Sequence, residues 1–150
     1  MRALLVVIGF VVLVGCGPPG RLNGTIRDRA TLGFDEVRAQ FLVDRLAISY
    51  RDARGIQEVV RLTMPSALAV KGAELDLTMK GMVLEHFATK EDDSGKLVTE
   101  PPFPPVKSGT VSLSEVGTAR GQLIVGEFHA IFVDSLDTLN GDFSATVVPP

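Results

Sequence analysis

The sequence predicts an all-β protein, an antiparallel β-sandwich or alternatively a β-barrel, and two observations lead to this prediction. Apolar and polar residues alternate in many short segments, for example at Phe128, Ala130 and Phe132, which is the two-residue period of half-buried strands. Turn-forming residues, such as Asn23-Gly24 and Ser94-Gly95, separate these segments at nearly regular spacing. Short strands of this kind are typical of sandwiches and barrels.

The first sixteen residues have the pattern of an export signal. A single positive charge, Arg2, precedes an unbroken apolar run from Ala3 to Val14, and the small residue Gly15 stands before Cys16. As a helix this run would span about 18 Å, well short of the ~30 Å hydrocarbon core of a bilayer. We therefore expect a cleaved signal peptide at residues 1–15 rather than a transmembrane helix.

The end of this segment resembles the lipobox of bacterial lipoproteins, an aliphatic residue, a small or aliphatic residue, a small residue and then cysteine, here Leu13-Val14-Gly15-Cys16. The resemblance implies cleavage between Gly15 and Cys16 and acyl chains, palmitate among them, on Cys16. Two or three such chains hold a protein at a membrane essentially permanently. Cys16 is the only cysteine, so it has no disulfide partner within the chain. The alternative is an ordinary signal peptide followed by a chance cysteine.

The lipobox resemblance also implies a location. In Gram-negative lipoproteins an aspartate after the cysteine commonly retains the protein in the inner membrane, and this chain has Gly17 there. We therefore expect a lipid-anchored protein of the cell envelope, placed in the outer membrane.

One domain is expected after the signal. Residues 16–21 form a short lipidated tether, because the glycines and prolines of Gly17–Gly20 favour no regular element, and residues 22–150 form a single β domain. The net charge is −3, with both signs mixed along the chain. This balance argues against nucleic acid and against an anionic lipid surface as partners, so membrane attachment must come from the lipid on Cys16.

Six strands are expected before the charged turn Glu91–Lys96. They lie around Thr25–Arg27, which follows an Asn-Gly turn, and at Phe34–Val43, Leu46–Arg51, Ile56–Met64, Val70–Met79 and Met82–Thr89. The segment 34–46 also fits a helical stripe, and we favour the strand. Arg51–Gly55 is expected to be a loop, and Pro65 is expected to end its strand because proline cannot donate to a ladder.

The second half of the chain begins with a predicted hairpin. Its tip is Glu91–Lys96 and its return strand is Lys96–Thr99. Pro101–Pro105 is expected to be a rigid crossover between sheets rather than a ligand for SH3-type domains. The last strands are expected at Gly109–Leu113, Gln122–Val133 and Gly141–Val148, with a turn at Asp134–Asp137 between the final two.

The last third of the chain is similar to small uncharacterised envelope lipoproteins of Gram-negative bacteria. The similar residues are Ser108–Leu113, Gly126-Glu127-Phe128 and Leu139–Ala145, which follow a Gly-Thr-Val-x-Leu, Gly-x-Phe, Leu-x-Gly-x-Phe-x-Ala pattern. Many of those proteins carry a cysteine pair that this chain lacks. The resemblance implies a β fold and an envelope location, and it implies no activity.

Two histidines are the main candidates for chemistry. His86 follows Glu85, and His129 follows Glu127 by two positions, so that Glu127 and His129 share one face of a strand. Zinc requires three or four ligands, and the close-spaced His or Cys motifs of zinc sites are missing. We expect two surface or rim histidines, no metal site and no cofactor.

Other catalytic and ion-binding patterns are weak. The sequence has no Gly-x-Ser-x-Gly nucleophile elbow and no phosphate-binding loop between a strand and a helix, so no catalytic residue is nominated. Asp92 and Asp93 could contact calcium with Glu91, but Leu97-Val98 interrupts the ligand pattern of an EF-hand. We expect a charged hairpin tip there.

The sequence therefore favours a non-enzymatic structural or interaction module anchored to a membrane of the cell envelope. The alternative is a carrier that binds a lipid or another hydrophobic ligand in a barrel cavity of several hundred Å³. An enzyme is the weakest hypothesis, because it would require His86 or His129 to lie beside convergent carboxylates in a cleft.

Overall fold

A computed structural model describes residues 20–28, 30–52, 57–133 and 135–150. In these ranges the chain is nearly all β, with two short 3₁₀ helices, η1 (Thr25–Asp28) and η2 (Ser66–Leu68). The strands are β1 (Gly20–Asn23), β2 (Glu36–Phe41), β3 (Arg45–Arg51), β4 (Glu58–Pro65), β5 (Glu74–Asp76), β6 (Val83–His86), β7 (Thr89–Glu91), β8 (Leu97–Thr99), β9 (Val106–Val116), β10 (Leu123–Phe132) and β11 (Thr138–Val148). The predicted all-β class is confirmed.

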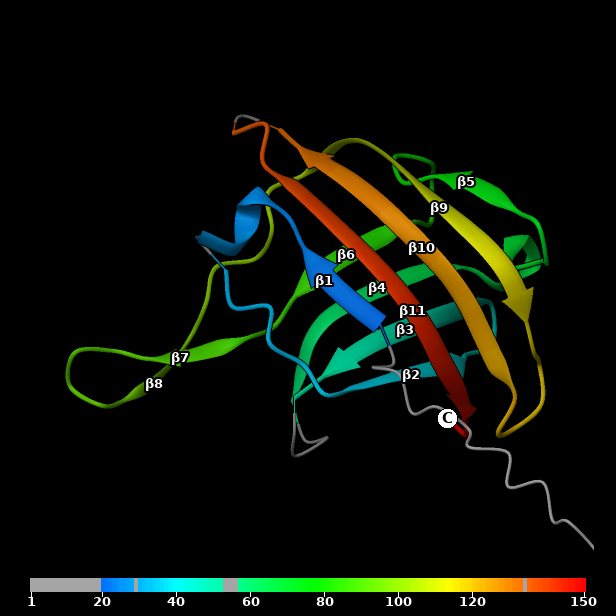
Figure 1. The fold of residues 1–150 in the computed structure, drawn as a ribbon, viewed down its shortest axis with the longest axis horizontal. Coiled ribbons are helices and arrows are strands. Elements are labelled where there is room, and N and C mark those ends of the chain that lie inside the picture. The colour runs from blue at the N-terminus through cyan, green and yellow to red at the C-terminus, as the bar shows by residue number, and fades with distance from the viewer. Residues whose placement is uncertain (1–19, 29, 53–56, 134) are drawn as a thin grey trace, which may run out of the picture.

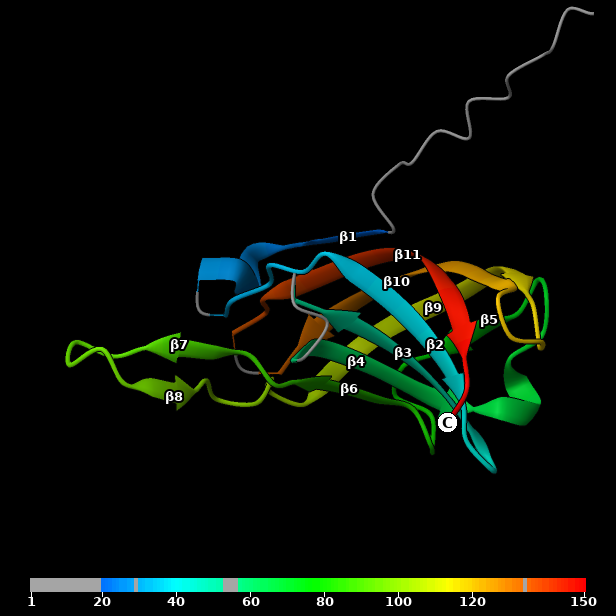
Figure 2. The ribbon, with the colours of Figure 1, turned by 90° about the horizontal axis from the view of Figure 1, so that it is seen from below.

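One strongly curled sheet makes up the body of the domain. Its order is β5-β9-β10-β11-β2-β3-β4-β6, and β1 pairs with β11 beside this path. The long strands β9, β10 and β11 form one wall, and β2, β3, β4 and β6 curl round to face it (Figures 1 and 2). β7 and β8 form a separate two-stranded sheet, which projects from the body as an arm.

The two walls meet where β1 and β2 share one edge of β11. β1 is antiparallel to residues 140–143 of β11, and β2 is parallel to residues 146–148. The chain reverses through η1 between these strands, and for this reason β2 runs in the same direction as β11. The predicted antiparallel sheet therefore contains one parallel pair among the described strands.

The first strand lies earlier in the chain than predicted. The sequence pattern placed it at Thr25–Arg27, whereas β1 is Gly20–Asn23 and residues 25–28 form η1. Asn-Gly ends the strand here because Gly24, with φ of 146°, passes so close to the carbonyl of Thr138 that no Cβ would fit. β1 thus includes Gly20 and Arg21, which had been assigned to the tether.

Two further strands are shorter than predicted. The segment Val70–Met79 contains only the three residues of β5, because the Asp76 carboxylate accepts hydrogen bonds of 2.7 Å from the amide and the hydroxyl of Thr78 and turns the chain. The segment Met82–Thr89 contains β6 and, at Thr89, the first residue of β7, and the chain leaves the body after Phe87.

The remaining strand predictions are confirmed. The ambiguous segment 34–46 forms β2 rather than a helix, and residues 89–99 form a hairpin. β4 ends at Pro65, and residues 101–105 connect the arm to β9 without regular structure. The last three predicted strands are β9, β10 and β11.

The core lies on the concave side of the curled sheet. In β10 and β11 the inward side chains alternate with outward polar ones, as the sequence predicted: Phe128, Ala130, Phe132, Leu139, Phe143, Ala145 and Val147 are all buried. β3 is buried on both faces, since its outer face carries Ala47 and Ser49 beneath longer side chains. Ser49 there donates a hydrogen bond of 2.7 Å to Glu58.

Two Gly-x-Phe triplets join β10 to β11. They begin at Gly126 and Gly141, and because the strands are antiparallel, Gly126 stands opposite Phe143 and Phe128 stands opposite Gly141. A Cβ on Gly141 would collide with the Phe128 ring, and one on Gly126 would lie 2.8 Å from the Phe143 ring. Each ring therefore covers the glycine of the facing strand, which is how aromatic residues compensate for glycine in a sheet.

Tyr50 connects the two walls across the core. Its hydroxyl donates a hydrogen bond of 3.0 Å to the main-chain carbonyl of Asp142. Its ring contacts Phe34 edge-on at 4.8 Å and Phe128 at 6.3 Å between centroids. Burial raises the pKa of this hydroxyl far above its ordinary value, with a smaller contribution from the charge of Asp142, so Tyr50 is a hydrogen-bond donor at every physiological pH.

We expect Gly141→Ala to reduce the free energy of unfolding by about 2 kcal/mol, because the new methyl group must displace the Phe128 ring. Gly33→Ala is the matched control, since a Cβ at Gly33 meets nothing within 4 Å. Urea denaturation followed by circular dichroism measures both. Equal stability of the two variants would show that the packing of the Phe128 ring does not require a glycine at position 141.

Candidate functional site

The predicted lipidation and cleavage residues, Cys16 and Gly15, lie outside the described residues. The described chain begins at Gly20, four positions after Cys16, where β1 pairs with Phe143 in the middle of β11. In the described part of the chain no helix is long and apolar enough to cross a membrane.

His86 lies in a buried polar cluster rather than at the surface or rim predicted for it. Its side chain is fully enclosed and stacks on the ring of Phe103, with 4.7 Å between centroids. One ring nitrogen, Nδ1, lies 3.2 Å from the carbonyl oxygen of Pro101, and Nε2 lies 3.0 Å from that of Thr31. Nε2 also lies 3.5 Å from the carboxylate of Glu100.

The carboxylate near His86 is therefore Glu100 and not the adjacent Glu85. Glu85 points outward and lies 4.0 Å from Arg61, because neighbours along a strand face opposite sides. Carbonyl oxygens only accept hydrogen bonds, and a neutral imidazole donates from one nitrogen only. Each ring nitrogen of His86 thus has one main-chain carbonyl within hydrogen-bond distance, and the Glu100 carboxylate lies on the Nε2 side of the ring.

This cluster clamps the root of the arm. His86 ends the strand that leads into the arm, and Glu100 follows the strand that leads out of it. Glu100 accepts hydrogen bonds from the amide and the hydroxyl of Thr31, at 2.7 and 2.9 Å, and its own amide donates to Ala88 at 2.9 Å. Three separate chain segments therefore meet at one enclosed polar cluster.

Sequence reasoning missed most of this clamp. Glu100 stood between a predicted strand and a proline-rich connector, and Thr31 stood in an unassigned segment. Gln57 was also missed. Its side-chain amide nitrogen donates a hydrogen bond to the carbonyl of Phe87, and its side-chain oxygen accepts one from the Thr89 hydroxyl. No sequence signal marks these residues, because the hydrogen bonds of Thr31 and Gln57 in the clamp reach partners 30 to 69 positions away.

His129 lies on the outer face of the sheet, as predicted for a surface histidine. It is exposed, and its Nδ1 contacts the side-chain oxygen of Asn140 on β11. Glu127 is exposed on the same face of β10, and the intervening Phe128 is buried, so the predicted shared face is confirmed.

Two rows of polar residues, each paired with its neighbour on the adjacent strand, cross this outer face from β1 to β5. The first row is Arg21, Asp142, Glu127, Ser112 and Glu74, and the second is Asn23, Asn140, His129, Thr110 and Asp76. Two adjoining shallow depressions, of about 250 and 490 Å³, lie over these rows and share Ser112, Glu127 and Asp142. Glu127 and Asp142 are directly opposed like charges, an arrangement that costs stability.

The acidic tip of the arm is stabilised by its own side chains. The Asp92 carboxylate accepts hydrogen bonds from the Ser94 amide, the Ser94 hydroxyl and the Lys96 amide, at 2.9, 2.6 and 3.0 Å. This is an Asx turn that closes a hairpin. Across the described residues no group of three or more His, Cys, Asp or Glu side chains is placed to hold a metal ion.

We expect Glu100→Ala to lower the free energy of unfolding by about 2 kcal/mol, because it leaves the amide and the hydroxyl of Thr31 without their acceptor. Glu91→Ala, at an exposed position of the arm, is the control, and we expect it to change stability by less than about 0.5 kcal/mol. Urea denaturation provides the comparison. If Glu100→Ala lost no more unfolding free energy than Glu91→Ala, the stabilising role of Glu100 in the clamp would be contradicted.

The Asp92 turn gives a pH-dependent prediction. The hydrogen bond from the Ser94 hydroxyl, followed by those from the Lys96 and Ser94 amides, lowers the pKa of Asp92 below its ordinary value. A carboxyl with a lowered folded pKa stabilises the turn at neutral pH, and that contribution is lost as pH falls through the folded pKa. We expect carbon-13 NMR to show Asp92 titrating at lower pH than a free aspartate and Ser94→Ala to raise its pKa. If the pKa of Asp92 did not change in Ser94→Ala, the hydrogen bond from Ser94 to Asp92 in this turn would be contradicted.

Comparison of the chain with protein-family models, with curated proteins and with solved structures found no match.

Proposed function

We propose that this chain is a lipid-anchored protein of the cell envelope, held in the outer membrane by acyl chains on Cys16, and that its β domain is a non-enzymatic interaction module. The lipobox pattern of Leu13-Val14-Gly15-Cys16 supports the anchor. In this proposal the domain acts by contact with other components of the envelope, on the periplasmic side of the membrane.

The arm is the observation that favours an interaction module. β7 and β8 pair with each other and project from the body, so both of their outer edges are open (Figures 1 and 2). Leu97 is 66% exposed on the arm. An isolated two-stranded hairpin is at best marginally stable in water, and the clamp at His86 and Glu100 and the Asp92 turn compensate for this. A hairpin that is fixed at its root and has both outer edges open is suited to contact with a partner.

The packing of the concave face favours this function over a carrier. A chamber for a hydrophobic ligand would leave its lining side chains accessible, whereas Tyr50, Leu46, Ile48 and Leu62 are 0% exposed. The depressions described above lie on the outer polar face and not in the core. The core of the described domain is thus filled by its own side chains.

The anchor is tested by metabolic labelling with a clickable palmitate. We expect the wild-type chain to be labelled and to sediment with membranes, and Cys16→Ser to lose both properties, because the thiol is the site of the thioether. Combining Cys16→Ser with Ser94→Cys restores a thiol on the exposed arm and is expected to restore no label. Equal labelling of the wild type and Cys16→Ser would contradict the proposal.

A further inference from the structure

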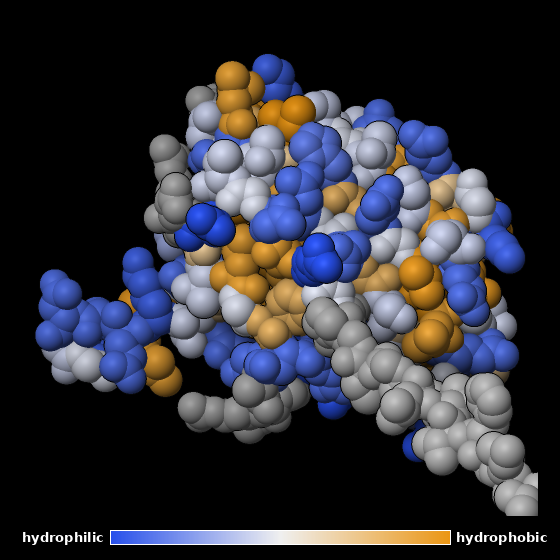
Figure 3. All heavy atoms as spheres, in the orientation of Figure 1, coloured by the Kyte–Doolittle hydropathy of each residue, from blue (hydrophilic) through white to orange (hydrophobic). Residues whose placement is uncertain are grey.

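Hydrophobic side chains reach the surface mainly at one end of the domain. Of the eight large hydrophobic residues that are exposed in the described ranges, five surround the end where β2, β4, β9 and β11 finish, and we call these five the apolar rim: Leu42, Val43, Val70, Val83 and Leu123. In Figure 3 hydrophobic residues reach the surface toward this end, at the lower right of the body. Leu97 and Leu136 lie at the opposite end, on the arm and in the β10–β11 loop.

Strand register brings one side of the rim together. Leu123 begins β10 opposite Thr146 near the end of β11, and Thr146 pairs with Arg38 on β2. The β2–β3 loop, with Leu42 and Val43 exposed, follows immediately beyond the end of β2. Figures 1 and 2 place this loop, the β9–β10 loop and η2 at the right-hand end of the molecule.

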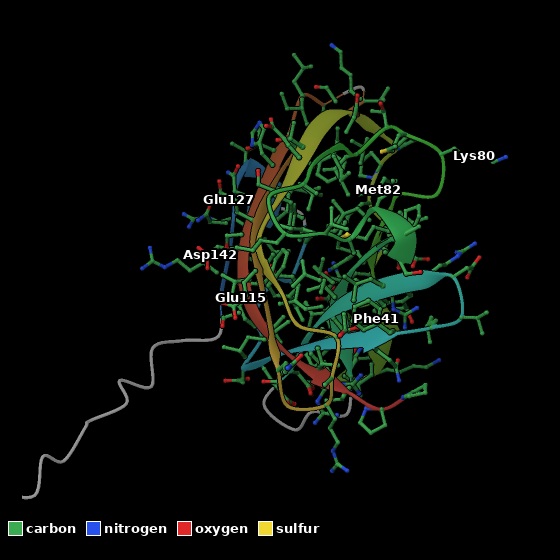
Figure 4. The ribbon with its side chains drawn as sticks, turned by 90° about the vertical axis from the view of Figure 1, so that its right-hand side faces the viewer. Phe41, Lys80, Met82, Glu115, Glu127 and Asp142 are labelled. Carbon is green, nitrogen blue, oxygen red and sulfur yellow. The ribbon has the colours of Figure 1, made fainter. Side chains whose placement is uncertain are left out.

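Loop contacts bring the other side of the rim to the same end. The Ser66 amide donates to the carbonyl of Asp44 in the β2–β3 loop at 3.0 Å, and Val70 follows η2 directly. Leu42 and Val83 line one groove on the outer surface of β2, β3, β4 and β6. The five hydrophobic residues therefore belong to segments that meet at one end of the domain, the end that faces the viewer in Figure 4.

Charge distinguishes this end from the outer face of the long strands. Exposed basic residues stand beside the rim, namely Lys71 and Arg120, and Lys80 extends from a neighbouring loop (Figure 4). Arg45 also lies there, paired with the exposed Asp44 at 3.8 Å. The outer face of β9, β10 and β11 presents acidic side chains instead, namely Glu115, Glu127 and Asp142. Net charge alone concealed this separation, because the two signs cancel over the whole chain.

Covalent reach limits which surface can meet the bilayer. Cys16 lies four residues before Gly20, so it reaches at most ~14 Å from that residue. Gly20 stands beside Phe143, and the five residues from there to Val148 cover ~17 Å of strand. Cys16 can therefore come within about 3 Å of the end of β11 where the rim lies, and the acidic outer face lies within its reach as well. An anchor on Cys16 can hold either surface near the membrane.

We infer that the apolar rim is a membrane-docking surface that rests in the headgroup layer of the lipid bilayer. The inference depends on the lipid anchor of the proposed function. Hydrophobic tips with neighbouring basic residues suit an interface of headgroups and acyl chains, whereas the acidic face would have to desolvate Glu127 and Asp142 to approach it. This orientation directs the arm away from the bilayer.

Fluorescence quenching on vesicles tests this orientation. The acylated full chain carries no free thiol, so single cysteines at Val43→Cys, Leu123→Cys, Leu136→Cys and Glu127→Cys can each be labelled with a polarity-sensitive fluorophore. The four positions represent the rim, the opposite end and the acidic face, and all four are exposed. The vesicles contain phosphatidylcholine, some phosphatidylglycerol and a headgroup-labelled nitroxide lipid. We expect several-fold stronger quenching at positions 43 and 123 than at 136 and 127.

Each other outcome has a distinct meaning. Strongest quenching at position 127 would place the acidic face on the bilayer and overturn the inference, and equally weak quenching at all positions would show a domain that stands clear of it. Both outcomes leave the anchor intact if the protein floats with the vesicles. If Cys16 of the parent chain reacts with the label and the protein does not float, the anchor itself fails, and the inference fails with it.

A matched pair of substitutions provides a second readout. We expect Val43→Asp to reduce quenching at position 123 several-fold, because a carboxylate at the rim opposes insertion. Leu136→Asp, at the opposite end, is expected to leave that quenching unchanged. Both residues are exposed, so both variants should fold as the parent does. Unchanged quenching at position 123 in Val43→Asp would overturn the inference.

Discussion

The packing of the Phe128 and Phe143 rings over the glycines of the facing strand determines how β10 and β11 meet, and the rest of the sheet is built outward from this pair. The rings lie on the concave side, where Phe128 also contacts Tyr50 from the other wall. The Tyr50 hydroxyl then bonds to the main chain of β11. One apolar layer thus joins strands that are more than 90 positions apart in sequence.

The arm depends on a different kind of interaction. It has no apolar layer beneath it, and its direction is set by the enclosed pair of His86 and Glu100 together with the donors of Thr31. Buried polar groups are costly to leave without a hydrogen-bond partner. Such a cluster is therefore suited to holding an element in one orientation, and this clamp holds both strands of the arm at its root.

In our proposals the apolar rim and the arm are two functional ends of the molecule. The lipid on Cys16 and the apolar rim would hold one end at the bilayer, and the clamped arm would present Leu97 to the periplasm at the other. The polar outer face, with its opposed Glu127 and Asp142, would remain in solvent between them. Anchoring, orientation and contact would then depend on separate residues, which allows each to be changed without the others.

The sequence by itself determined the all-β class and most of the strands, because the alternation of apolar and polar residues is a local property that survives into β2, β10 and β11. It also determined the hairpin tip, since Asp92 and Ser94 act within five residues. Only the tertiary structure decided that His86 pairs with Glu100, that Asn23-Gly24 ends a strand, that β2 runs parallel to β11 and that five exposed hydrophobic residues share one end. These features depend on which distant segments meet when the sheet curls, and the pattern of any one segment does not encode the position of its partner.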